Sequence, residues 1–255
     1  MKRFLTLTSW LLVMGLAGCS TPAPRAANGN ATIHLTATLV SPIDIVLNWQ
    51  DNAPDAAGHI VEWTSDLKDD YVILGFVPAN TNTFLHPNLM PETTCHYRVR
   101  AYFGPASSPV EITLPEGLSD SEYATRFDAP EEYHWAIPTT IPGDPKAVKK
   151  SIRNAGTVAD AAPTDLKGAL MPITVSGFKL TWTDNASDED GYLVEMKPEG
   201  SPDFKVCAIL GRDINSFGYA FEPPQRKGAF RVRAFYFGKP SNLVSKTTGA
   251  APPDH

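Results

Sequence analysis

An internal repeat limits what this chain can fold into more than any other feature of its sequence. The matched blocks are residues 47–62 with 180–195, residues 82–84 with 215–217, and residues 97–102 with 230–235. All three matches have the same offset of 133 positions, and chance similarity does not produce a constant offset over separated blocks. We therefore expect two units of the same fold, each of roughly 85 residues, with about 45 residues between them.

Within each unit, apolar residues recur at every second position. Ile45, Leu47 and Trp49 alternate with the polar residues Asp44 and Asn48. Successive side chains of a β-strand point to opposite faces, so this alternation indicates half-buried strands. Turn-forming residues separate several such short runs, at the spacing of roughly 8–12 residues that is typical of an antiparallel sandwich.

Each unit resembles a fibronectin type III domain of the form common in bacterial surface proteins. The resemblance rests on a tryptophan followed by Asp-Asn, a glycine that opens a strand ending in Val-Glu, and an aromatic-Arg-Val-Arg-Ala strand. It implies an all-β fold of two immunoglobulin-like antiparallel sandwiches, at residues 31–114 and 162–248. The family's corner tyrosine is replaced by Cys95 in the first unit and by Gly228 in the second.

The alternation of apolar and polar residues also assigns positions to side chains in each sandwich. The expected inward residues are Trp49, Tyr97, Val99 and Ala101, with Trp182, Phe230, Val232 and Ala234 in the second unit. The expected solvent-facing ion pairs are Glu62 with Arg98 or Arg100, and Glu195 with Arg231 or Arg233. Exposed pairs of this kind contribute about 0.2–1 kcal/mol each.

The segment between the units, residues 115–161, contains several aromatic residues and two helix-start signals. Ser119 and Glu122 have the spacing of a capping box, while Asp144 precedes a proline and Gly156 could end the helix that follows. We therefore expect a long, partly helical linker with two short helices that pack against one or both sandwiches.

The N-terminus has the pattern of an export signal. Two basic residues precede an apolar run at residues 4–16, which is too short to cross a bilayer of roughly 30 Å as a helix. The Leu-Ala-Gly-Cys sequence that ends at Cys19 resembles the lipobox of bacterial lipoproteins. The resemblance implies that residues 1–18 are a signal peptide and that Cys19 becomes the lipidated N-terminus.

The rest of the N-terminal region and the overall charge extend this reading. Residues 19–30 are small and polar, as expected for a flexible tether, and residues 249–255 are expected to form a disordered tail. Ser20 after the cysteine favours the outer membrane, by resemblance to Gram-negative sorting. With 22 basic and 28 acidic residues, the chain is a poor partner for nucleic acid.

The acidic run between the Trp and Gly motifs of the second unit is a weak calcium candidate. Its carboxylates Asp184, Asp188 and Asp190 could supply oxygen ligands, but their spacing is not that of an EF-hand loop. A solvated loop in which an Asp-Asn pair caps a turn explains the same residues. We therefore predict no resident metal and no cofactor.

Four aromatic residues are candidate glycan or partner contacts. Tyr133 and Trp135, or Trp63 and Tyr102, could stack on sugar rings if their faces are exposed. The alternative is that these rings fill the contact between linker and sandwiches, and this alternative is favoured.

No motif in the sequence indicates catalysis. The chain has no Gly-x-Ser-x-Gly elbow and no glycine-rich phosphate loop. We therefore expect a non-enzymatic, lipid-anchored protein of the bacterial cell envelope, which binds or spaces an envelope protein. A carbohydrate-binding accessory protein for cell-wall or environmental glycan is the alternative, and a purely structural spacer is a third.

Overall fold

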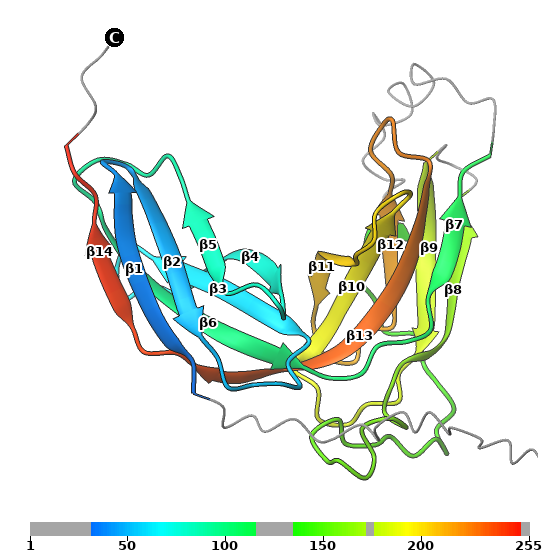
Figure 1. The fold of residues 1–255 in the computed structure, drawn as a ribbon. Coiled ribbons are helices and arrows are strands. Elements are labelled where there is room, and N and C mark those ends of the chain that lie inside the picture. Colours follow the sequence, from blue (N-terminus) through cyan, green and yellow to red (C-terminus); the bar gives the residue numbers. More distant parts are fainter. Residues whose placement is uncertain (1–31, 116–134, 172–175, 251–255) are drawn as a thin grey trace, which may run out of the picture.

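The computed structural model describes residues 32–115, 135–171 and 176–250, and these residues form an all-β fold (Figure 1). The strands are β1 (His34–Ser41), β2 (Asp44–Gln50), β3 (Gly58–Thr64), β4 (Val72–Pro78), β5 (Thr83–His86), β6 (Thr94–Phe103), β7 (Val110–Thr113), β8 (Thr164–Leu170), β9 (Gly177–Thr183), β10 (Gly191–Pro198), β11 (Lys205–Leu210), β12 (Ser216–Ala220), β13 (Lys227–Pro240) and β14 (Val244–Thr247). The predicted signal peptide, Cys19 and most of the predicted tether and tail lie outside the described residues. Within the described ranges, no helix is long and apolar enough to cross a membrane.

The strands form two arms that meet in a V (Figure 1). We call β1–β6 and β14 the first arm, and β7–β13 the second arm. In the first arm, the sheet β1-β2-β5 faces strands β14, β6, β3 and β4; in the second arm, the sheet β12-β9-β8 faces β7, β13, β10 and β11. Strands β11-β10-β13-β6-β3-β4, with β7 and β14, form one continuous eight-stranded sheet, and each arm is a three-stranded sheet packed against one half of it.

The core of each arm contains the residues that the alternation predicted. Trp49 is 2% exposed and Trp182 is 4% exposed, and both belong to the main apolar cluster. The inward-facing residues predicted on β6 and β13 are buried as well. Burial of large aromatic side chains supplies much of the stabilisation available to a small sandwich.

The two short strands that follow β6 and β13 do not pair where the order of the repeats predicts. β7 follows β6 in the sequence but pairs with β13, and β14 follows β13 but pairs with β6. Equivalent hydrogen bonds lead into both strands: Val232 N donates to Ser107 Oγ at 3.1 Å, and Val99 N donates to Ser241 Oγ at 3.0 Å. We call this arrangement the strand exchange.

β7 lies within residues 31–114, the first unit expected from the sequence, but it pairs with β13 and completes the second arm. Residues of β14 complete the first arm instead. A four-residue strand carries little pattern of its own, so the sequence does not specify which edge it joins. The chain passes from the first arm to the second near Gly104 and returns to the first near Gly238, so the strands of the second arm lie between these two points in the sequence.

At the junction of the arms, β6 and β13 pair with each other, with Tyr236 opposite Phe103 and Phe237 opposite Tyr102. The rings of Phe103 and Tyr236, which are 133 positions apart, stack with their centroids separated by 5.3 Å. A second buried apolar cluster, the junction cluster, consists of Ile60, Tyr102, Leu193 and Phe235. At the offset of 133, Ile60 corresponds to Leu193 and Tyr102 to Phe235. Equivalent residues of the two arms therefore contact each other, as they do between the subunits of an isologous dimer.

Ion pairs form on β3 and β10 as predicted, but their carboxylates are buried rather than exposed. Glu62 is 3% exposed and pairs with Arg98 and Arg100, while Glu195 is 3% exposed and pairs with Arg231 and Arg233. Arg98 also lies 3.9 Å from the centroid of the Tyr71 ring, and Arg231 lies 4.2 Å from that of Phe204. Two guanidinium groups enclose each carboxylate, so water is excluded from it.

The helix predicted from Asp144 to Gly156 is wrong, and the other predicted linker helix lies outside the described residues. The segment instead follows the second arm in extended and turn conformations: Thr139 N donates to Ser216 O at 2.9 Å, and Lys150 N donates to Asn185 O at 2.7 Å. Backbone bonds to the neighbouring sheet and loop replace those of a helix, and they outweigh a short helix's weak local preference.

Candidate functional site

The aromatic contact candidates do not form an exposed row. Tyr102 belongs to the junction cluster, where burial raises its pKa to about 12, and Trp135 is only 9% exposed. Trp63 is half-buried, and its ring lies 5.2 Å from the His86 ring, centroid to centroid. Tyr133 lies outside the described residues. The three described rings therefore have no shared exposed face on which a sugar could stack.

The structure does not bring the three calcium candidates together. Asp188 accepts hydrogen bonds from Ser151 Oγ at 2.6 Å and from Ile152 N at 2.7 Å, so it fastens the linker to the loop. Asp190 accepts from Arg153 and from two further donors. Of the three, only Asp184 joins a group of carboxylates; its neighbours there are Glu189, which belongs to the same acidic run, and Asp213, which the sequence analysis did not select.

We call this group, Asp184, Glu189 and Asp213, the carboxylate cluster. One oxygen from each residue lies within 4.8 Å of the others. Asp184 and Glu189 belong to the loop between β9 and β10, and Asp213 belongs to the turn between β11 and β12. The ammonium of Lys149 lies 2.7 Å from Asp184 Oδ2 and 2.6 Å from Asp213 Oδ1.

Glu189 is the unusual member of the cluster. It is 3% exposed; its Oε1 accepts from Asp213 N at 3.4 Å, while its Oε2 has no hydrogen-bond partner among the described residues. Burial raises the pKa of its carboxyl above the ordinary value, and the nearby charge of Asp184 also raises it. A buried carboxylate oxygen without a donor is costly, because nothing replaces its hydration.

The rest of the cluster is held firmly in place. Asp184 Oδ1 accepts from Ala186 N at 2.9 Å and from the Tyr192 hydroxyl. Burial, and then the hydrogen bond to Asp184, raise the pKa of Tyr192, so its hydroxyl remains a donor at neutral pH. Asp184 and Asp213, but not the buried Glu189, also line a groove of about 630 Å³ between the linker and strands β8 and β9, which gives this side of the cluster access to solvent.

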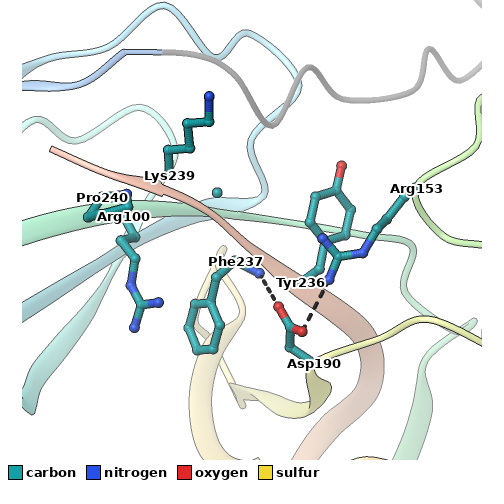
Figure 2. A pocket seen from close by; sticks show the side chains of 8 residues that line it. Arg100, Arg153, Asp190, Tyr236, Phe237, Lys239 and Pro240 are labelled. Carbon is teal, nitrogen blue, oxygen red and sulfur yellow. Dashed lines mark hydrogen bonds and ion pairs between the residues drawn. The ribbon is translucent and has the colours of Figure 1, made fainter.

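A second pocket lies at the junction of the arms (Figure 2). Asp190 lies in its wall and is bonded to Arg153 at 3.1 Å and to the Phe237 amide at 2.9 Å. Arg100 lies 4.0 Å from the centroid of the Phe237 ring and is paired with Glu62. These charges are already compensated inside the protein, so their role is to hold the junction.

Comparison of the two repeats could have revealed the carboxylate cluster. At the offset of 133, Asp184 corresponds to Asp51, but Glu189 corresponds to Ala56 and Asp213 to Asn80. Sequence reasoning selected carboxylates close together in one loop, whereas the turn before β12 brings the third from a separate segment.

No protein-family model matches the sequence, and no curated protein matches it. Among solved structures, a two-domain fibronectin type III segment from chicken tenascin is 15% identical, with a TM-score of 0.26, and covers 87% of this chain and 99% of its own. A pectate lyase from Erwinia chrysanthemi in complex with tetragalacturonic acid is 18% identical, with a TM-score of 0.26. That match covers 28% of this chain and 23% of the lyase. A redesigned β-sandwich protein is 20% identical, with a TM-score of 0.24, and covers 27% of this chain and 72% of its own.

Proposed function

We propose that this chain is a lipid-anchored protein of the bacterial cell envelope and that it serves as a non-catalytic spacing or protein-binding module. Residues 1–18 are its signal peptide, Cys19 carries the lipid that holds it at the outer membrane, and residues 19–30 are the tether. In this proposal the arms are two fibronectin type III domains.

The strand exchange is the observation that carries the spacing role. Two chain crossings and the β6–β13 pairing connect the arms, instead of a single linker. Any change in the angle between the arms would break backbone hydrogen bonds and expose the junction cluster. Two arms connected in this way keep their far ends at a fixed separation, whereas two domains joined by a single flexible linker do not.

The surface supports a spacer with polar partner contacts more than a broad apolar docking site. The exposed large apolar residues on strands are Val40, Val72, Leu85, Leu170 and Ile209, and they are distributed over five strands of both arms. Apolar side chains dispersed in this way are normal on a soluble surface, whereas a docking patch is contiguous over several hundred Å².

Fractionation of cells that express the full chain tests the anchor. Wild-type protein is expected in the outer-membrane fraction, and Cys19→Ala should release it, because one acyl-bearing residue is the proposed attachment. Retention of the Cys19→Ala variant in membranes would contradict the proposal. Capture with the full chain from solubilised envelopes then tests for a protein partner, and a bound glycan polymer in place of a protein would support the carbohydrate alternative.

A further inference from the structure

The carboxylate cluster occupies positions that the fold does not require to be acidic. The first arm builds the same loop and turn with Ala56 and Asn80 where the second arm has Glu189 and Asp213. The first arm nevertheless packs its three-stranded sheet against its half of the eight-stranded sheet, as the second arm does. Glu189 therefore adds a buried charge to the second arm that the architecture can do without, and this charge opposes folding unless something compensates it.

The geometry of the cluster fits a bound cation. Three carboxylates converge, with one donor oxygen from each within 4.8 Å of the others. Glu189 Oε2 is buried and has no partner among the described residues, although Lys149 already neutralises part of the charge on the other two carboxylates. Three carboxylates and one ammonium give the cluster a net negative charge. One carboxylate oxygen, Glu189 Oε2, also has no hydrogen-bond donor among the described residues.

We propose that the carboxylate cluster binds one hard divalent cation of the calcium type, which takes the place of the Lys149 ammonium. Calcium accepts oxygen ligands from separate segments in irregular geometry and tolerates bound water, whereas magnesium requires a nearly ideal octahedron. The side chain of Lys149 is 37% exposed, so its ammonium can move into solvent. The adjoining groove admits the ion and the water molecules that complete its coordination.

The site is independent of the spacing function and differs from the loop-only calcium candidate, because it uses Glu189 and Asp213 in place of Asp188 and Asp190. Those two aspartates remain committed to the linker and the junction. The first arm lacks the equivalent of the cluster, so the proposal provides one such site among the residues that the structure describes.

Terbium luminescence tests the proposal on the soluble full chain that carries Cys19→Ala. Trp182 lies 5.6 Å from Tyr192, ring centroid to ring centroid, and the Tyr192 hydroxyl contacts Asp184, so both rings can sensitise an ion in the cluster. We expect saturable luminescence with one terbium per chain, displaced by calcium. Signal that rises without saturation, or that calcium does not displace, would overturn the proposal.

Variants locate the ion. Glu189→Gln keeps the shape and removes one charge, so the affinity should fall by about tenfold, while Lys149→Met should raise it because the competing ammonium is gone. Asp213→Asn gives a second test that does not disturb the core, since the Asp213 side chain is 62% exposed. Glu199→Gln, at a side chain that is 71% exposed, is the matched control and should bind as wild type does. Equal affinity in all of these proteins would overturn the proposal.

Discussion

Removal of one carboxylate from the buried ion pairs should destabilise the protein strongly. Glu195 lies between Arg231 and Arg233, with its Oε1 2.8 Å from Arg233 Nε, and its side chain is only 4% exposed. Glu195→Gln leaves two guanidinium groups facing a neutral amide in a site from which water is excluded. Loss of one partner from a buried ion pair costs about 3–5 kcal/mol.

The urea midpoint of unfolding, followed by tryptophan fluorescence, measures this cost. With a slope of about 3 kcal/mol per molar, the midpoint should fall by about 1–1.7 M. Urea is preferred to guanidinium chloride because a salt would screen the charges. Glu111→Gln is the control, since Glu111 is 72% exposed and lies 3.8 Å from Lys227, and it should cost no more than about 1 kcal/mol. If Glu195→Gln shifted the midpoint no further than Glu111→Gln does, the argument from burial would be refuted.

Two further predictions concern the second arm. Gly218→Ala should displace the linker, because the added Cβ would lie 2.4 Å from Ala136 Cα and 2.5 Å from the Trp135 ring. The tryptophan fluorescence spectrum should shift to the red, and the shift should disappear when Trp135 is also replaced by Phe. An unchanged spectrum would contradict this prediction. Burial raises the pKa of Cys207 to about 12, so the native thiol should react with iodoacetamide at pH 8 far more slowly than the unfolded thiol. Since the folded pKa is the higher one, the contribution of Cys207 to stability should be lost as the pH rises from about 9 toward 12, and Cys207→Ala should flatten the urea midpoint in that range.

Local patterns in the sequence predicted the architecture within each arm. The alternation around Trp49 and Trp182 specifies which face of each strand is buried. The Glu and Arg residues at matched strand positions predicted the ion pairs. These features depend on neighbours in one sheet, which the sequence period determines.

Features that depend on contacts between distant segments could not be predicted. β7 and β14 are four-residue strands that fit the edge of either β6 or β13, and the junction that selects between them forms only when both arms are present. The segment from Asp144 to Gly156 has helical end signals, but hydrogen bonds to the second arm determine its path. The carboxylate cluster escaped notice because Asp213 is 24 positions from Glu189 and approaches it only through the turn before β12.

Engineered disulfides test the strand exchange, which is the central claim, most directly. Thr94 pairs with Thr247 in the structure, and their Oγ1 atoms are 2.9 Å apart, so Thr94→Cys with Thr247→Cys should give a disulfide of normal geometry. Without the exchange, Thr94 would instead pair with Thr113, the residue of β7 that corresponds to Thr247. Both double variants would be made in the full chain with Cys19→Ala, oxidised, and mapped by peptide mass spectrometry under non-reducing conditions. The account predicts a disulfide within one chain in the variant with cysteines at 94 and 247, and free thiols in the variant with cysteines at 94 and 113. The opposite result, a disulfide between 94 and 113 and free thiols at 94 and 247, would contradict it.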